Sequence, residues 1–108
     1  MSANLPAPIA TYLAGVNRQD IDAMLATFSA DPKVTDEGAT RTGRAAVRLW
    51  MEETTRKYGV SLQTMSAEEE GDRLALHLLM TGNFPGSPAH ITYRFTLRGD
   101  EIVALEIS

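Results

Sequence analysis

The stretch Asp31-Pro32-Lys33-Val34-Thr35-Asp36-Glu37 separates a helical first part of the chain from a second part that reads mainly as strands. Its first two residues end a helix, because the residue before a proline disfavours helical geometry. The remaining five predict a strand, whose side chains alternate between two faces. The polar face, which ends with Glu37, should meet water. Val34 and Asp36 therefore face the interior.

An inward Asp36 indicates a site, because a buried carboxylate costs free energy unless it is paired, hydrogen-bonded or protonated. Two interpretations are open. Asp36 could be a general base whose basicity is raised by apolar neighbours such as Trp50. It could instead be structural, accepting hydrogen bonds from the backbone or from an arginine such as Arg41.

Three helices are expected before and after this stretch. Pro8 suits the first turn of a helix, and apolar residues then recur at helical spacing with Tyr12 on their flank. Asp20 can cap a second helix whose apolar stripe ends at Phe28. A third helix is predicted over residues 44–58, capped by Thr42 or Gly43 and stopped by Gly59.

Strands dominate the rest of the chain. We expect a short strand at 39–42 and longer ones at 60–67, 74–80, 91–97 and 102–107, with a polar turn at 68–72. The strand at 74–80 is apolar on both faces, so it should be covered on both sides. Early helices and late strands predict an α+β fold, in which a curved, mostly antiparallel sheet wraps around the N-terminal helices as a cone-shaped α+β barrel. The mouth of such a cone can admit a small ligand.

Composition limits the function classes. The 108 residues suit one domain, 1–108, with 44% hydrophobic and 22% charged residues and a net charge of −4. Without a Lys/Arg cluster, nucleic acid and membrane surfaces are not expected partners. The chain has no cysteine and only two histidines, in no metal-binding pattern, so no metal site is predicted. The N-terminus shows no secretory signal, and we expect a cytoplasmic protein.

Several segments resemble a known superfamily. Its pattern is matched in order and spacing by residues Tyr12, 20–24, 28–31, 34–36 and 43–48. They are similar to the nuclear-transport-factor-two-like superfamily, in its SnoaL-like and ketosteroid-isomerase-like branches. The resemblance implies a cone-shaped α+β domain, a homodimer and a hydrophobic ligand. It does not fix a function, because this cone hosts isomerases, cyclases, dehydratases and binding modules.

The isomerases of this family suggest roles for single residues. By resemblance, Asp36 matches their general base and Tyr12 their oxyanion-binding tyrosine. A late-strand aspartic acid completes the family constellation, but Tyr93 stands at that position here. Its phenol could donate a hydrogen bond or only fill the pocket. We expect the substrate pocket to be lined by Trp50, Phe28, Phe95 and Val34.

Two functions follow as hypotheses. The first is a cofactor-free enzyme that moves a proton alpha to a carbonyl of a small hydrophobic substrate. Isomerisation is favoured over polyketide-cyclase-like ring closure as its reaction. Asp36, Tyr12 and Tyr93 would be its catalytic residues. The second is a non-catalytic ligand-binding or interaction domain of the same fold, in which Tyr12 and Tyr93 are core aromatics whose hydroxyls find other partners.

Overall fold

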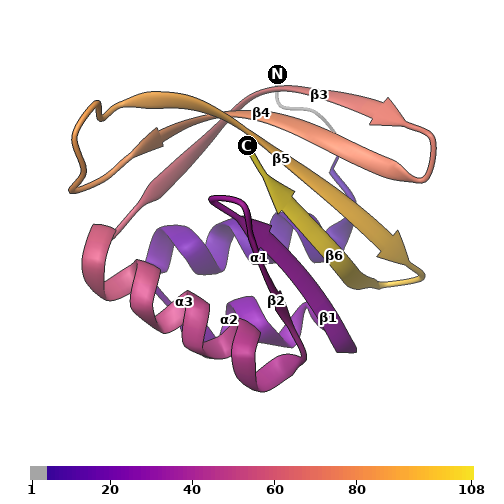
Figure 1. The fold of residues 1–108 in the computed structure, drawn as a ribbon. Coiled ribbons are helices and arrows are strands. Elements are labelled where there is room, and N and C mark those ends of the chain that lie inside the picture. Colours follow the sequence, from indigo (N-terminus) through magenta and orange to yellow (C-terminus); the bar gives the residue numbers. More distant parts are fainter. Residues whose placement is uncertain (1–4) are drawn as a thin grey trace.

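The computed structural model describes residues 5–108, which form three helices and six strands (Figure 1). In chain order these are α1 (Ala7–Arg18), α2 (Ile21–Ala26), β1 (Phe28–Asp36), β2 (Ala39–Thr42), α3 (Arg44–Tyr58), β3 (Ser61–Glu70), β4 (Arg73–Thr81), β5 (Ala89–Arg98) and β6 (Glu101–Ile107). The α+β prediction is confirmed.

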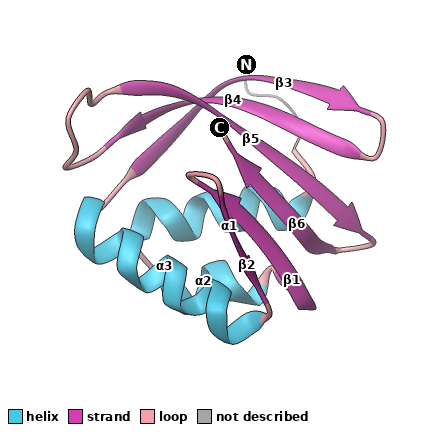
Figure 2. Ribbon diagram, viewed as in Figure 1, coloured by secondary structure: helices cyan, strands magenta, loops and turns pink. Residues whose placement is uncertain are grey.

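The strands form one curved sheet in the order β2-β1-β6-β5-β4-β3. All neighbours are antiparallel except β1 and β6, which run parallel. The parallel pair makes the sheet mixed. Because β2 and β3 remain as edges, it does not close into the expected barrel. The three helices lie together on one side of it, as the secondary-structure colouring makes plain (Figure 2). Most of the apolar core therefore lies between the helices and the facing side of the sheet.

Local signals place the start of α2 and both ends of α3 where the sequence predicted them. The carboxylate of Asp20 accepts a hydrogen bond from the backbone N–H of Ala23 at 3.1 Å and caps α2. Helix α3 begins after Gly43, which offers no side-chain cap. It ends at Gly59, whose φ of 55° is the left-handed conformation that stops many helices.

The predicted end of the second helix is wrong. Helix α2 stops at Ala26, and Phe28 already belongs to β1, which runs through Pro32. Pairing with β6 explains the change, since the Ile102 N–H donates to the Thr27 carbonyl oxygen at 2.9 Å. The register of this pairing shifts between Phe28 and Lys33. Proline lacks a backbone N–H, and such an irregularity is where a strand tolerates it.

The expected turn at 68–72 is also wrong in part. Residues Glu68 to Glu70 continue β3, and only Gly71-Asp72 turn the chain. Cross-strand partners make an acidic strand end acceptable: Glu68 lies 2.8 Å from His77, and Glu70 lies 3.2 Å from Arg94. The length of β3 follows from its pairing with β4. The alternation of polar and apolar residues within β3 alone does not reveal that pairing.

Aromatic rings fill one end of the space between α1 and the sheet. The ring of Tyr12 meets those of Phe28 and Phe95 edge to face, with centroids 5.6 and 5.8 Å apart. Val34 is completely buried close to this end, as strand alternation predicted. No helix among residues 5–108 is long and apolar enough to cross a membrane. At the other end, the same helix and sheet leave a cavity.

Candidate functional site

A cavity of about 350 Å³ lies between the helices and the concave side of the sheet. Buried side chains form its floor, among them Tyr12 from α1, Trp50 from α3 and Tyr93 from β5. Asp36, at the end of β1, contributes a carboxylate to the same wall. Four of the predicted site residues therefore line one small cavity, although they come from four separate elements.

The carboxylate of Asp36 is held by an indole. The Trp50 Nε1–H donates to Asp36 Oδ2 at 3.1 Å, across 14 positions of sequence. Arg41, the alternative structural partner, donates instead to the backbone carbonyl oxygens of Asp36 and Ala39, at 3.2 and 3.3 Å. Within the described part of the chain, Asp36 Oδ1 accepts no hydrogen bond. One carboxylate oxygen is thus fixed, and the other can meet a ligand.

Tyr12 and Tyr93 present neutral phenols to this region. Burial raises the pKa of the Tyr12 hydroxyl well above its usual value, and the neighbouring Tyr93 and Asp36 raise it further. Burial also raises the pKa of Tyr93, again with a contribution from Asp36. A phenol near a carboxylate in an apolar surrounding resists losing its proton. Both hydroxyls therefore remain hydrogen-bond donors throughout the physiological pH range.

Three residues expected in the pocket do not line it. The side chains of Phe28, Phe95 and Val34 are at most 2% exposed and belong to the packed end of the core. Phe28 and Phe95 pack against the ring of Tyr12 instead. Helical and strand periodicity identify inward residues, but they do not tell a filled end of the interior from an empty one.

The mouth of the cavity contains residues that sequence reasoning missed. Tyr58 at the end of α3 and Phe84 in the β4–β5 connection both line it, with ring centroids 6.2 Å apart at 89°. The backbone joins the same two segments, since the Asn83 N–H donates to the Tyr58 carbonyl oxygen at 2.8 Å. Figure 1 shows this connection lying over the C-terminal end of α3. Only the folded structure brings these segments together.

Glu37 is exposed, as the strand pattern predicted, and it also contributes to the cavity lining, which the sequence did not indicate. Strand β1 ends at Asp36, and Glu37 adopts a φ of 55°, which takes its side chain out of the strand alternation. The Glu37-Gly38 pair was the available signal for this turn, because a short turn between two strands commonly needs left-handed residues.

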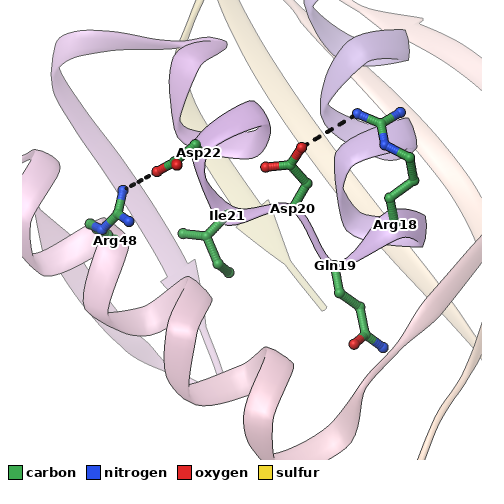
Figure 3. A pocket seen from close by; sticks show the side chains of 6 residues that line it. All are labelled: Arg18, Gln19, Asp20, Ile21, Asp22 and Arg48. Carbon is green, nitrogen blue, oxygen red and sulfur yellow. Dashed lines mark hydrogen bonds and ion pairs between the residues drawn. The ribbon is translucent and has the colours of Figure 1, made fainter.

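A second hollow lies on the surface between the α1–α2 region and α3 (Figure 3). Its charged groups already pair with one another: Arg48 lies 2.8 Å from Asp22, and Arg18 lies 3.7 Å from Asp20. All four side chains are well exposed, so these ion pairs contribute little to stability, and every charged side chain that lines the hollow already has a partner. This hollow carries no catalytic constellation.

Metal chemistry has no support in the described residues. No group of three or more His, Asp or Glu side chains in 5–108 is arranged to hold an ion. What the cavity offers is a fixed carboxylate, two neutral hydroxyl donors and an apolar wall. This set can abstract a proton and stabilise a negatively charged oxygen, or it can bind a polar group of a hydrophobic ligand.

Solved structures share this fold over nearly the whole chain. A candidate polyketide cyclase from Sinorhizobium meliloti is 32% identical, with a TM-score of 0.91, covering 96% of this chain and 95% of its own. A hypothetical protein with a ketosteroid isomerase-like fold from Catenulispora acidiphila, solved with trimethylamine, is 23% identical. Its TM-score is 0.82, with 97% of this chain and 86% of that chain covered.

Another candidate polyketide cyclase, from Xanthomonas campestris, is 22% identical with a TM-score of 0.78 and coverage of 93% and 85%. Comparison with curated protein sequences gave no significant match. The SnoaL-like domain model matches residues 9–105, which include every residue of the candidate catalytic set. The chain therefore belongs to the SnoaL-like domain family, as its sequence pattern had suggested.

Proposed function

We propose that the cavity binds a small hydrophobic carbonyl compound and that Asp36 removes a proton from the carbon next to the carbonyl. One observation carries this proposal. The Asp36 carboxylate lies in the wall of a largely apolar cavity, fixed at one oxygen by Trp50, and two neutral phenols line the same cavity. A base and oxyanion donors around one apolar space are what enolisation requires.

The reaction begins with proton transfer from the alpha carbon to Asp36. The electron pair of the broken C–H bond moves toward the carbonyl, and negative charge develops on its oxygen. Tyr12 donates a hydrogen bond to that oxygen, and Tyr93 assists from β5. Return of the proton from Asp36 to a different carbon of the conjugated system completes an isomerisation. The step needs no cofactor, because no electrons leave the substrate.

A polyketide-cyclase-like reaction is the second candidate, favoured by the 32% identity to a candidate polyketide cyclase. It shares the first step. The enolate carbon would then attack a second carbonyl of the same molecule and form a ring, and the new alkoxide would take the proton held by Asp36. The two functions therefore differ in the substrate and not in the role of the base.

Turnover of a β,γ-unsaturated ketone tests the proposal, because the conjugated product absorbs in the ultraviolet. Asp36→Asn should lower kcat/KM by about 10²- to 10⁴-fold, the usual contribution of a general base. Asp31→Asn removes an exposed carboxylate from the same strand and should leave the rate unchanged. Unchanged turnover in Asp36→Asn would exclude the base role. Ligand binding without turnover on ketones or diketones would favour the non-catalytic binding domain.

We also propose that two copies of the chain associate through the outer face of the sheet. Leu79 of β4 is only half-buried in the single chain, on a strand that is apolar on both sides. Analytical ultracentrifugation at micromolar concentration should show a dimer, and Leu79→Lys should shift it to monomer. A wild-type chain that sediments only as a monomer would contradict this assembly.

A further inference from the structure

Glu37 adopts a backbone conformation that glutamate rarely takes. It forms, with Gly38, the two-residue connection between β1 and β2, and the φ angles of these residues are 55° and 76°. Hairpin turns with two left-handed residues favour asparagine, aspartate or glycine at the first position. A strained residue next to a site suggests that its side chain is needed there. Glu37 directly follows Asp36 in the chain, and both residues line the cavity.

The charged side chains that line the cavity are both acidic. They are Asp36 and Glu37, and no Lys, Arg or His of the described chain lines it. The guanidinium of Arg41 is near but is bonded to two backbone carbonyl oxygens of the hairpin. Lys57 lies 5.2 Å from the centroid of the Tyr58 ring, outside the lining. Neither cation forms an ion pair with the two carboxylates within residues 5–108.

Aromatic rings accompany Glu37 at the mouth. Tyr58 and Phe84 line the cavity together with it, and their rings meet edge to face. The negative face of an aromatic ring attracts a cation, and the attraction grows as water is excluded. Rings and a carboxylate without an ion-pair partner among residues 5–108, lining one cavity, therefore favour a positive group and disfavour a negative one.

The two carboxylates have different surroundings. Asp36 is bonded to Trp50 and half-buried, whereas Glu37 is exposed at the entrance. A cation bound against Asp36 would stabilise its charged form and weaken it as a base. A cation at Glu37 leaves Asp36 free for the carbonyl. The charged end of a ligand therefore belongs at the mouth, and its apolar body belongs on the floor.

We propose that Glu37 determines specificity by charge, so that the cavity selects small hydrophobic ligands that carry a protonated amine and rejects those that carry a carboxylate. The inference rests on the proposed function only in using the same cavity as the binding site. It does not depend on proton abstraction by Asp36. It adds a ligand class, a hydrophobic compound with an ammonium group held at Glu37.

Binding of three matched probes tests this selection: 4-phenylbutylamine, 4-phenylbutan-1-ol and 5-phenylpentanoate, which share an apolar body and differ in end-group charge. Trp50 is the only tryptophan and lines the cavity, so its fluorescence reports binding. Wild type should bind the amine about fivefold more tightly than the alcohol, and the carboxylate most weakly. Added salt should narrow these differences, because the entrance is exposed.

Glu37→Gln keeps the shape of the side chain and removes its charge. It should weaken amine binding by about fivefold, strengthen carboxylate binding, and leave the alcohol unchanged. Asp31→Asn, which lowers the net negative charge equally but lies outside the cavity, should keep the wild-type ranking. Equal affinities in wild type, preferred binding of the carboxylate, or binding of none of the probes would overturn the inference. So would an equal effect of Glu37→Gln on all three.

Alpha-proton exchange of a neutral ketone by the wild type separates this inference from the proposed function. Exchange without the charge ranking contradicts the role of Glu37 and leaves Asp36 as the base. If the probes bind in the predicted order of charge but no exchange occurs, the role of Asp36 as base is contradicted and the selection by Glu37 is kept.

Discussion

Tyr93 and Phe95 lie two positions apart on the same face of β5, yet they belong to different parts of the interior. Phe95 is completely buried and packs edge to face on Tyr12. Tyr93 also contacts Phe95, with centroids 6.1 Å apart, but it lines the cavity as well. Along β5, the interior thus changes from packed core to candidate binding site between two successive residues on the same face. Core packing and cavity lining are therefore separated along the sheet, and aromatic residues contribute to both.

Tyr12 joins the two regions. Its ring packs on Phe28 and Phe95, and the same side chain lines the cavity. The packed rings hold the phenol in place, so the hydroxyl is positioned without a hydrogen bond to another described side chain. A rigid donor of this kind is what stabilisation of a developing negative charge needs.

Truncating a side chain in the packed core should lower the free energy of unfolding more than truncating one that lines the cavity. Phe95→Ala should lower the free energy of unfolding by about 3–5 kcal/mol, the range for a fully buried aromatic. Tyr93→Ala should cost at least about 1 kcal/mol less, because it enlarges an existing cavity. Urea denaturation of both variants measures the difference. Equal losses would show that the cavity end is packed as tightly as the core.

Alkaline pH should destabilise the protein through the two cavity phenols. Both have a pKa raised above the ordinary value of 10.0. Above pH 10 the unfolded chain releases these protons and the folded chain keeps them, so stability falls as pH rises. The slope should approach about 1.4 kcal/mol per pH unit for each phenol. Denaturation between pH 9 and 12 measures it, and Tyr93→Phe should remove one phenol's share. An unchanged slope in that variant would contradict the assignment.

Trp50→Phe should affect the reaction through Asp36. The change keeps an aromatic ring but removes the N–H that holds Asp36 Oδ2. Loss of a hydrogen bond to a charged group predicts a decrease in kcat of about tenfold with little change in KM. Steady-state kinetics on the unsaturated ketone measure both. A change in KM alone would mean that Trp50 only shapes the pocket.

The smallest expected effect concerns the strained turn. Glu37→Asn should raise the free energy of unfolding by up to about 1 kcal/mol, because asparagine tolerates the left-handed conformation. Gly38→Ala is the matched opposite: nothing lies within 4 Å of the added carbon, so backbone strain alone should destabilise it. Thermal unfolding of both compares them. A destabilised Glu37→Asn would show that the turn is not strained.

The sequence predicted the fold better than it predicted the site. Periodicity located α3 correctly and turned Val34 and Asp36 inward, because each inference depends on local spacing alone. The error at Phe28 has a non-local cause, since pairing of β1 with β6 overrides the helical pattern. Strand pairing likewise extended β3 through residue 70.

For the site, the resemblance suggested the cavity residues Asp36, Tyr12 and Tyr93, but the hydrogen bond from Trp50 required the packing of α3 on β1. Phe28 and Phe95 were misplaced because inward residues look alike in sequence, whether they fill space or surround it. Glu37 was expected only to face water, and its place in the cavity lining depends on elements that are distant from it in the sequence.

Deuterium exchange at the alpha carbon of 4-phenylbutan-2-one, followed by NMR in D₂O, tests the central claim most directly. It reads the proton transfer that isomerisation and ring closure share. We predict that wild type accelerates exchange and that Asp36→Asn lowers the rate by about 10²- to 10⁴-fold, while Asp31→Asn does not. Equal exchange by wild type and Asp36→Asn would contradict the assignment of Asp36 as the base.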